Sequence, residues 1–595
     1  MRLQEYWGVG PKTAELLETE LGVERAVRAI ESADVSTLVD AGLPRGRATR
    51  ILRRATGAAG LDTLGTGDAR DVYGDLLELA AGEALTGGAA DRIRVLTPLA
   101  SHEAADERLD RIDQAREVWT DLGEDDRERV IGAFASYDEA GGGRRAAVDA
   151  ALELRRAGTN ESGPFDRLAE LDADALEAAV DALAAVEGEF GDGDEPLSVG
   201  AGADERLDEL RTQLAAARRL DDAALDVLET VRGQGVRSLE AFQSAVISYV
   251  AEETGVTASE VRSVAPDEAR DETDFVSATL RALVGDLEGQ VADREATVAA
   301  DLRETLDDAG EGIEAAVDAV DELAFDLSLA RFAASHDLTR PTLVEDGLAV
   351  RGARNLFIDG DVQPVTYGVG THSVDGGRDA TGEAAPDPPS GDRVTVLTGA
   401  NSGGKTTLLE TLCGVALLAA MGLPVPAERA EVGRFDTVVF HRRHASFNAG
   451  VLESTLRSVV PPLTGEGRAL MLVDEFEAIT EPGRAADLLN GLVDLTVDRG
   501  ALGVFVTHLA EDLSPLPDTA RIDGIFAEGL TDDLGLRVDY QPRFGTVGRS
   551  TPEFIVSRLV ANAGDRDERA AFRSLAAAVG EEAVQRTLSD AEWQG

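Results

Sequence analysis

The sequence predicts a multidomain protein of mixed fold class, in which helical domains precede an α/β domain. Its 595 residues exceed what one hydrophobic core usually holds. Apolar residues recur at helical spacing in segments such as "ERLDRIDQAREVW". Further along, apolar runs alternate with helical segments, as is typical of a mainly parallel sheet. We expect four parts: a compact module at 1–57, helical core and arms at 58–340, the α/β domain at 341–560, and a helical segment at 561–595.

Acidic residues dominate the composition. The chain has 112 Asp and Glu against 57 Lys and Arg, a formal net charge of −55, and its two lysines are Lys12 and Lys405. This pattern favours a cytoplasm of very high salt, where carboxylates hold water and salt screens their repulsion. The same screening weakens long-range forces on nucleic acid. Any such contact would therefore use backbone amides, helix N-termini and hydrogen bonds.

Cysteine usage and hydropathy exclude several classes of protein. The one cysteine, Cys413, lies in an apolar helical run and allows neither an intrachain disulfide nor a cysteine-based metal site. We expect it to be buried as a small hydrophobic residue. No run resembles a signal peptide or approaches a membrane span, so we expect a cytoplasmic protein without a membrane partner.

The module at 1–57 has two similar halves. Each contains a Gly-rich turn that opens a helix, "GVGPKTAELL" in the first and "GLPRGRATRIL" in the second. These halves resemble a tandem helix-hairpin-helix module, whose turns let backbone N–H groups approach DNA phosphates without reading sequence. The resemblance implies DNA contacts at Gly8, Gly10, Lys12, Thr13, Gly42, Arg45, Gly46 and Arg47. A helical protein-interaction module is the alternative.

The middle of the chain is helical in pattern. A Gly/Asp-rich stretch at 188–204 reads as a linker or loop tip. The helical pattern at about 272–335 is long enough to predict extended antiparallel or coiled arms. Strand-like runs follow in "TLVEDGLAVRGARNLFI" and "VQPVTYGVG", and we expect a mobile loop at 376–392.

The α/β domain contains a phosphate-binding motif. "GANSGGKT" fits G-x-x-x-x-G-K-[ST] and lies between a strand and a helix, as that motif requires. The glycines let the backbone wrap phosphate oxygens, Lys405 supplies a compact charge, and Thr406 can ligate Mg²⁺. We therefore predict ATP and Mg²⁺ as cofactors, with nucleotide contacts at Gly399, Asn401, Ser402, Gly403, Gly404, Lys405, Thr406 and Thr407.

Two further strands end in polar residues. "ALMLVDE" ends in Asp474 and Glu475, and "GVFVTH" ends in His508. Adjacent carboxylates at a buried strand end are costly to desolvate, so a metal and a nucleotide explain them better than structure alone. We expect Asp474 to hold Mg²⁺ with Thr406, Glu475 to polarise the attacking water, and His508 to sense the γ-phosphate.

These three strand ends resemble an ABC-type P-loop ATPase, and finer features resemble the MutS family. The ATPase blocks are "TGANSGGKTTLLETL", "LVDEFEAITEPGRAADLLNGLVD", "FVTHLAEDL" and "YQPRFGTVGRSTPEFIVSRL". Two other segments, "VLTPLASHEAADERLDRIDQAREV" and "DELAFDLSLARFAASHD", are similar to the ends of that family's lever region. The blocks occur in order over roughly residues 90–560.

The chain also departs from the family pattern. "NAGVLES" replaces the family's signature helix, so the residues implied to meet the partner subunit's γ-phosphate are Asn448, Gly450, Glu453 and Ser454. We find neither the F-x-E motif of a mismatch-reading domain nor a nuclease signature after residue 560. The sequence therefore predicts neither mismatch recognition nor nuclease activity.

The resemblance implies a homodimeric ATPase whose ATP hydrolysis controls its grip on DNA. We expect branched or structured DNA in repair or recombination to be recognised by structure rather than by sequence. Two alternatives stay open. One is a ribosome-associated MutS-like ATPase that acts on stalled translation. The other is a structural ATPase of the SMC type, which the family-specific blocks disfavour.

Overall fold

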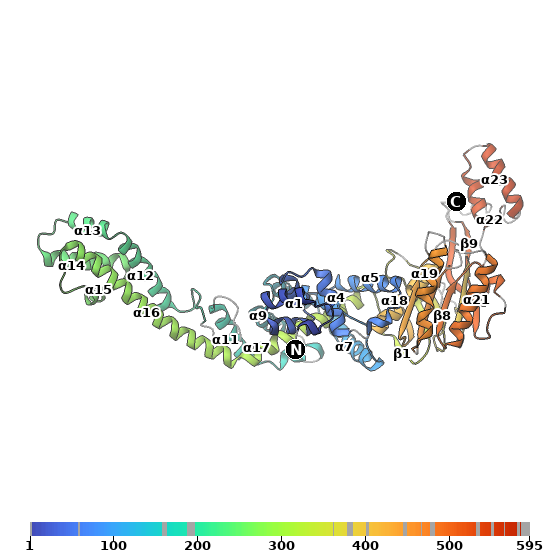
Figure 1. Cartoon of the computed structure of the whole chain (residues 1–595), viewed down its shortest axis with the longest axis horizontal. Coiled ribbons are helices and arrows are strands. Elements are labelled where there is room, and N and C mark those ends of the chain that lie inside the picture. Colours follow the sequence, from blue (N-terminus) through green and yellow to red (C-terminus); the bar gives the residue numbers. More distant parts are fainter. Residues whose placement is uncertain are drawn as a thin grey trace. The chain divides into compact units, whose positions relative to one another are not determined.

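The chain combines helical and α/β parts, as predicted (Figure 1). The structure is a computed structural model. It describes residues 3–31, 33–57, 60–156, 163–186, 197–360, 362–377, 385–399, 404–443, 449–465, 467–475, 482–513, 515–530, 536–548, 552–564, 566–579 and 584. It divides into two compact units: unit 1 comprises Met1–Arg127 and Asp321–Gly595, and unit 2 comprises Glu128–Val320.

Unit 1 begins with a small helical module. Its core holds apolar residues from every helix of the module, among them Leu17, Ile30 and Leu38. The turns before the first and fourth α-helices contain Gly8 at φ +83° and Gly42 at φ +93°, a conformation that glycine adopts without steric cost. The elements are η1 (Leu3–Glu5), α1 (Pro11–Glu20), α2 (Val23–Glu31), α3 (Val35–Asp40) and α4 (Arg45–Gly57).

The next segment packs against the α/β part of unit 1. Leu64 forms a parallel bridge with Val438, which extends the edge of the large sheet. The Thr66 hydroxyl donates to the Phe440 carbonyl over 2.6 Å, and the same oxygen caps α5 by accepting from Ala69 N. The elements are η2 (Gly60–Thr63), α5 (Gly67–Ala81), α6 (Gly87–Arg94) and α7 (His102–Asp121).

Two sheets form the α/β part. The six-stranded sheet has the order β10-β9-β4-β8-β7-β6, and all its neighbours run parallel except β9 and β10. The four-stranded sheet has the order β1-β5-β2-β3. The strands are β1 (Thr342–Val344), β2 (Leu348–Ala353), β3 (Val365–Val369), β4 (Val394–Gly399), β5 (Arg429–Gly433), β6 (Thr437–His441), β7 (Ala469–Asp474), β8 (Leu502–Val506), β9 (Ala520–Leu530) and β10 (Leu536–Phe544).

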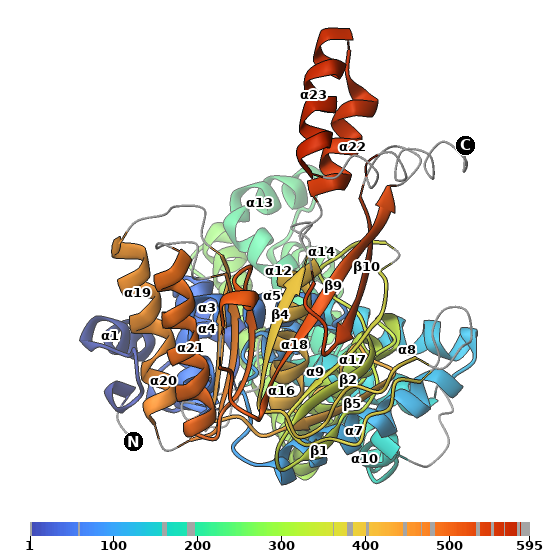
Figure 2. The same cartoon turned by 90° about the vertical axis from the view of Figure 1, so that its right-hand side faces the viewer.

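Helix α18 shares one core with both sheets, which explains why it is apolar all round. Cys413 on this helix is fully buried, as predicted, and burial raises the pKa of its thiol. Helices α19, α20 and α21 cover the other face of the six-stranded sheet (Figure 2). The remaining elements of unit 1 are α18 (Gly404–Ala420), α19 (Ala449–Val459), α20 (Pro461–Thr464), α21 (Pro482–Asp498), η5 (Ala510–Asp512), α22 (Pro552–Asn562) and α23 (Arg566–Val579).

Unit 2 is helical, and two long helices account for the stretch predicted at 272–335. Helix α16 (Glu272–Asp308) has 37 residues, and α17 (Gly310–Ser335) continues into unit 1. The other helices are α8 (Glu124–Glu139), which begins in unit 1, α9 (Arg144–Arg156), η3 (Gly163–Phe165), α10 (Asp166–Ala169), α11 (Ala173–Ala185), α12 (Glu205–Asp222), α13 (Ala224–Gly233), α14 (Leu239–Thr254) and α15 (Ala258–Val264).

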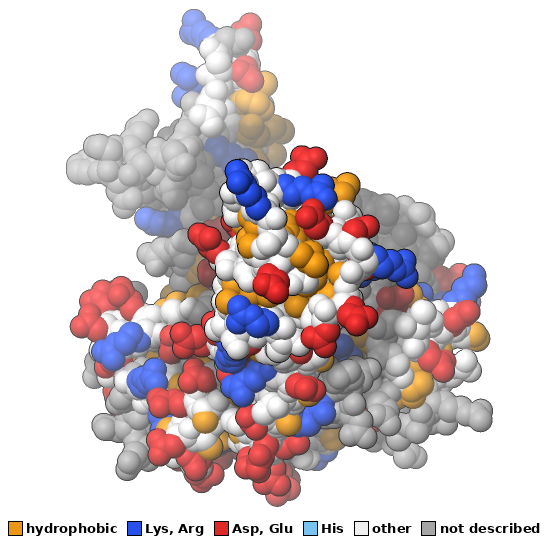
Figure 3. All heavy atoms as spheres, turned by 90° about the vertical axis from the view of Figure 1, so that its left-hand side faces the viewer, with side chains coloured by type: hydrophobic (Ala, Val, Ile, Leu, Met, Phe, Trp, Pro, Cys, Tyr) orange, Lys and Arg blue, Asp and Glu red, His pale blue; other side chains and the backbone are white. Residues whose placement is uncertain are grey.

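Helices α12 to α16 enclose a hydrophobic core in unit 2. Figure 3 looks onto the end of unit 2 formed by α13 and α14, where hydrophobic side chains gather among charged ones. Leu225 and Leu239 are exposed on these two helices. Across the described ranges of both units, we find no helix that combines the length and the apolar character needed to span a membrane.

Candidate functional site

The polar residues predicted at three strand ends lie together. Strands β4, β8 and β7 are parallel neighbours in the six-stranded sheet, so their carboxyl ends share one edge. Helix α18 starts at that edge. The structure therefore brings together the side chains of Lys405, Thr406, Asp474, Glu475 and His508, which come from separate segments of the chain.

The phosphate-binding loop begins where only glycine fits. Gly399 has φ +129°, and a Cβ there would lie 2.1 Å from the Ile525 carbonyl oxygen on β9. The Lys405 Nζ donates to the Gly399 carbonyl over 2.8 Å, and the lysine is only 4% exposed. Three predicted nucleotide contacts lie outside the described residues: Asn401, Ser402 and Gly403.

Thr406 and Asp474 form an oxygen-donor pair. The Thr406 hydroxyl donates to Asp474 Oδ2 over 2.5 Å, across the gap between α18 and β7. Burial raises the pKa of Asp474, with a further increase from Glu475, although the Thr406 hydrogen bond and Lys405 act in the opposite direction. A hydroxyl beside a carboxylate is the donor set that Mg²⁺ prefers, so these residues fit the predicted cofactor.

Glu475 sits among three cationic or titratable groups. One carboxylate oxygen lies 2.6 Å from His508 Nε2 and 3.8 Å from Lys405 Nζ. The other accepts a hydrogen bond from Arg443 over 2.6 Å. Burial by itself would raise the pKa of Glu475, but the His508 hydrogen bond and the three neighbouring charges outweigh it, so the pKa is lowered. The carboxylate thus stays ionised, as a water-polarising group must.

The backbone at Glu475 is unusual for a side-chain-bearing residue. Its φ is +39°, in the left-handed region that residues other than glycine rarely adopt. The Glu475 N–H still donates to the Val506 carbonyl on β8 over 3.1 Å. Backbone strain of this kind clusters at functional sites, where surrounding contacts hold it in place.

A cavity of about 330 Å³ adjoins the start of α18. Ile358 and Tyr540 line it and are partly exposed, at 45% and 37%. The Tyr540 ring packs so closely on Gly404 that a Cβ there would lie 2.4 Å from Cδ1. Gln363 fixes this wall, because its side-chain oxygen accepts from Tyr540 N over 3.1 Å. Sequence motifs did not identify this cavity, because its lining comes from segments far apart in the chain.

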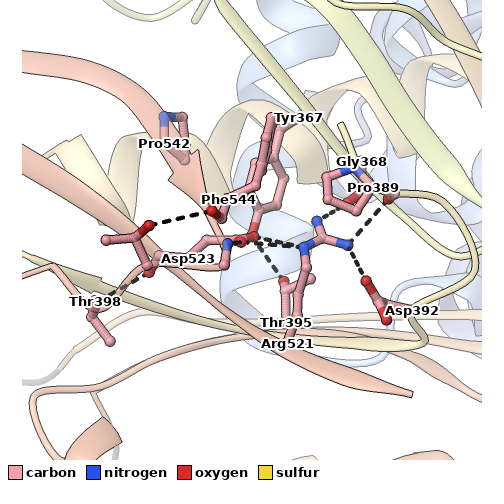
Figure 4. Close-up of polar contacts among 12 residues, drawn as sticks. Tyr367, Gly368, Pro389, Asp392, Thr395, Thr398, Arg521, Asp523, Pro542 and Phe544 are labelled. Carbon is pink, nitrogen blue, oxygen red and sulfur yellow. Dashed lines mark hydrogen bonds and ion pairs between the residues drawn. The ribbon is translucent and has the colours of Figure 1, made fainter. Parts of the chain in front are cut away.

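A buried polar network supports the strand that leads into the phosphate-binding loop (Figure 4). The Tyr367 hydroxyl lies 2.9 Å from both Thr395 Oγ1 on β4 and Asp523 Oδ2 on β9. Arg521 Nε donates to the same Asp523 oxygen over 2.9 Å, and a second nitrogen pairs with Asp392. Burial raises the pKa of Tyr367, so its phenol stays protonated. These bonds tie β3, β4 and β9 together beneath the site.

The segment after β10 packs directly on the loop strand. Gly548 N donates to Thr398 Oγ1 over 2.6 Å, and a Cβ at Gly548 would lie 2.8 Å from Gly399 Cα. Gly545 N donates to Asp523 Oδ1 over 3.1 Å. Residues 540–548 therefore fix the base of the predicted phosphate-binding loop through the close contacts of Gly545 and Gly548.

The residues predicted to meet a partner's phosphate lie at the start of α19. Glu453 is exposed and pairs with Arg457 one turn later over 2.7 Å. Ser454 is also exposed on this helix, and Gly450 lies in its first turn. Asn448 lies outside the described residues. Glu453 therefore pairs within α19 rather than with the side chains at the strand ends.

The helices that follow the two Gly-rich turns of the N-terminal module meet at their first turns. Arg47 on α4 donates to the Thr13 hydroxyl on α1 over 2.6 Å, which places the first turns of both helices together. Thr13 is only 2% exposed, so its burial argues against a direct DNA contact by this side chain. Arg45 pairs with Asp91, whereas Lys12 is exposed beside the Gly10 cap. Gly10 has φ −77°, so the positive φ belongs to Gly8 and Gly42, and Gly46 lies in the first turn of α4.

Comparisons with known proteins point to one family, although no family model matches the chain. The chain is 44% identical over 239 residues to a DNA-binding protein MutS2 of Pyrococcus furiosus, covering 40% of each chain. It is 30% identical over 374 residues to a DNA mismatch repair protein MutS 2 of Halobacterium salinarum, covering 59% of this chain and 40% of that one. An Endonuclease MutS2 of Pelotomaculum thermopropionicum is 27% identical over 253 residues, which is 42% of this chain and 30% of that protein.

The chain thus spans well under two thirds of the length of these relatives. Two of them are archaeal, and one of these comes from a Halobacterium. The matches agree with the motifs and with the geometry at the three strand ends. Over the aligned residues, the chain is therefore similar to proteins named MutS2 and to mismatch repair proteins named MutS.

Proposed function

We propose that this protein is a MutS-type ATPase that binds DNA and uses ATP hydrolysis to control its grip on it. The observation that carries the proposal is the convergence of Lys405, Thr406, Asp474 and Glu475 at one sheet edge. MutS-family proteins bind ATP, and the names of the relatives support DNA as the macromolecular partner rather than the ribosome.

Each residue of the site has a chemical role in this proposal. Lys405 and the loop backbone bind the phosphates, and the Ile358–Tyr540 cavity takes the base of the nucleotide. Thr406 and Asp474 would hold Mg²⁺, which neutralises phosphate charge when it is bound. Glu475 polarises the attacking water, while His508 and Arg443 hold its carboxylate in position.

The finer parts of the proposal concern assembly and substrate. In a homodimer, Gly450 together with the exposed Glu453 and Ser454 of α19 would meet the nucleotide of the partner subunit. The paired helix N-termini near Lys12 and Arg47 would position a duplex backbone without reading its sequence. Branched DNA in repair or recombination is the substrate class that such structure-based contacts favour.

Replacing the glutamate tests the catalytic assignment. Glu475→Gln keeps the size of the side chain but removes its charge, so ATP should bind within about twofold while hydrolysis falls by about 10²–10⁴-fold. Binding is measured by calorimetry and hydrolysis by phosphate release. Glu428→Gln is the matched control, because Glu428 is an exposed residue whose ion pair with Arg351 lies outside the site. Wild-type hydrolysis by Glu475→Gln would show that Glu475 is not the water-polarising group.

A further inference from the structure

A concave surface of unit 1 collects positive charge in an otherwise acidic chain. A cavity of about 640 Å³ opens between the end of α4, the turn at Trp7, the start of α5 and the α19–α20 junction. Among its described lining residues, Asp62 is the one carboxylate. The whole chain has 112 acidic against 57 basic side chains, so the ratio is reversed here. We call this surface the arginine groove, after its arginines Arg50, Arg53, Arg54, Arg70 and Arg457.

Two of these arginines are held against aromatic rings. The Arg53 Nε donates to the Arg94 carbonyl over 2.8 Å, and its guanidinium lies 5.1 Å from the centroid of the Tyr73 ring. The Arg54 guanidinium lies 5.1 Å from the centroid of the Trp7 ring. Aromatic faces hold these groups without neutralising them, so the wall of the groove keeps its positive charge.

Two others have no such neighbours. Arg50 and Arg70 are exposed and form no ion pair with any carboxylate in the described ranges. Arg340 shows the contrast, since it pairs with three aspartates of α7. Like charges on one concave surface repel each other, and an anionic ligand would offset that repulsion. Guanidinium groups are well suited to phosphate, because they bind it through two parallel hydrogen bonds.

Trp7 gives the groove an aromatic surface beside these charges. The residue is 54% exposed, although an indole of this size is normally buried. Nucleic-acid bases stack on such rings, whichever base is present. Inside a duplex both faces of a base are already stacked on neighbours, so an indole at the surface can stack only on an unpaired base.

We propose that the arginine groove binds a single-stranded segment of DNA, with phosphates on the arginines and a base on Trp7. This inference rests on the proposed DNA binding and deepens it by assigning a second site. The helix N-termini near Lys12 would hold a duplex, and the groove would take the strand that leaves this duplex at a branch. Substrates with both elements would then bind better than either element alone.

The groove also touches the helix that carries the predicted partner-facing residues. Arg457 lies near the end of α19 and pairs with Glu453 over 2.7 Å, with both side chains exposed. A phosphate bound by Arg457 would compete with Glu453 for the guanidinium group. Strand binding would thereby free the Glu453 carboxylate of the same helix, which would link the groove to the nucleotide of the partner subunit in the proposed homodimer.

Removing the unpaired arginines tests the groove directly. The full-length protein is titrated against fluorescent single-stranded dT20, a 20-base-pair duplex, rU20 and inorganic polyphosphate, at a fixed salt concentration that keeps it folded. Arg50→Ala/Arg70→Ala should weaken dT20 binding about tenfold, and Trp7→Ala should do the same while Trp7→Phe retains most of it. Duplex affinity should stay within about twofold. Arg145→Ala/Arg219→Ala, which removes two exposed arginines of unit 2, is the matched control and should bind all probes as wild type.

The outcomes separate this inference from the proposed function. Unchanged dT20 binding by both groove variants, with duplex binding intact, would overturn the groove alone. Tighter binding of rU20 than of dT20 would overturn DNA as the ligand of the groove. If polyphosphate displaces dT20 and Trp7→Ala leaves dT20 affinity unchanged, the groove is a general phosphate site instead. Absence of binding to every DNA probe by the wild type would overturn the groove and the proposed function together. Thermal melts of each variant check that it is folded.

Discussion

The nucleotide site and the arginine groove offer phosphate two very different surroundings within unit 1. In the nucleotide site, Lys405, Asp474 and Glu475 are each less than 7% exposed, and every one has a polar partner at a defined distance. In the groove, Arg50 and Arg70 are exposed and have no carboxylate partner among the described residues. In the proposed function, the buried residues would orient reacting atoms, whereas the exposed arginines of the groove would supply charge to a flexible strand.

The difference explains how the chain uses its two lysines. Lys405 is buried and donates to the Gly399 carbonyl, and its ammonium group is a compact point charge rather than a planar fork. The groove uses arginine throughout. Lys12 resembles the groove residues in exposure, although it lies beside the cap of α1. Burial, rather than the identity of the anion, separates the two kinds of site.

The largest expected effect comes from removing the buried lysine. Lys405→Ala deletes a charge-assisted contact to phosphate and leaves Glu475 with one cationic neighbour fewer, so ATP binding should weaken by about 3 kcal/mol. Calorimetry with ATP measures the change. Lys12→Ala is the natural control, because it removes the other lysine and should leave ATP affinity unaltered. An equal loss of ATP affinity in the two variants would contradict the proposed difference between the buried and the exposed lysine.

A smaller effect is expected beneath the phosphate-binding loop. A Cβ at Gly548 would lie 2.8 Å from Gly399 Cα and 2.9 Å from the Thr398 carbonyl, so Gly548→Ala must displace the loop strand. Overpacking of this kind costs about 1–3 kcal/mol, part of which should appear as weaker ATP binding. Gly491→Ala is the control, since a Cβ there meets nothing within 4 Å. Unaltered ATP binding and melting temperature for Gly548→Ala would show that this contact is not needed.

Substitutions in the first Gly-rich turn should lower stability according to the backbone φ of the replaced glycine, and not only according to the space around it. Gly8→Val places a branched side chain at φ +83° and 3.1 Å from Ile51 Cγ1, which should destabilise unit 1 by about 1–2 kcal/mol. Gly10→Val is the comparison, because Gly10 has φ −77° and open space around its Cβ position. Thermal melts measure both. A larger loss of stability for Gly10→Val would contradict the assignment of the strained turn to Gly8.

The smallest effect concerns Lys12 and DNA. If backbone amides and helix ends provide most of the duplex grip, Lys12→Ala should weaken duplex binding by at most about 1 kcal/mol, equally for different sequences. Anisotropy titrations with two unrelated duplexes measure it. A loss confined to one sequence would mean that Lys12 reads bases rather than positions a backbone.

Local sequence patterns predicted which side chains meet at the strand ends but not what surrounds them. Lys405, Asp474 and His508 could be identified because each follows a strand within a short motif, and parallel strands bring their ends together. Arg443 could not, because it reaches the site from a segment without a motif. Tyr540 lies in a segment with a family resemblance, but nothing in that segment indicates that its ring packs against Gly404. Their positions depend on tertiary packing that no spacing in the sequence reveals.

The N-terminal module shows a second limit of prediction from sequence, which concerns the burial of single side chains. The repeat of two Gly-rich turns was visible in the sequence, and it identified Gly8 and Gly42 correctly as turn residues. Thr13 follows the same turn, yet it faces the interior and accepts a hydrogen bond from Arg47. Which face of a short helix is buried depends on its neighbours, so the exposure of a single threonine could not be predicted.

The central claim is that nucleotide bound at the strand ends changes the grip on DNA, and linkage gives the most direct measurement of it. The affinity of Glu475→Gln for a four-way junction is measured by anisotropy without nucleotide and with saturating ATP and Mg²⁺, at one salt concentration. Coupling between two sites is typically about 1–3 kcal/mol, so we predict an affinity change of at least about fivefold. ATP that binds fully to this variant yet leaves its junction affinity unchanged would contradict the account.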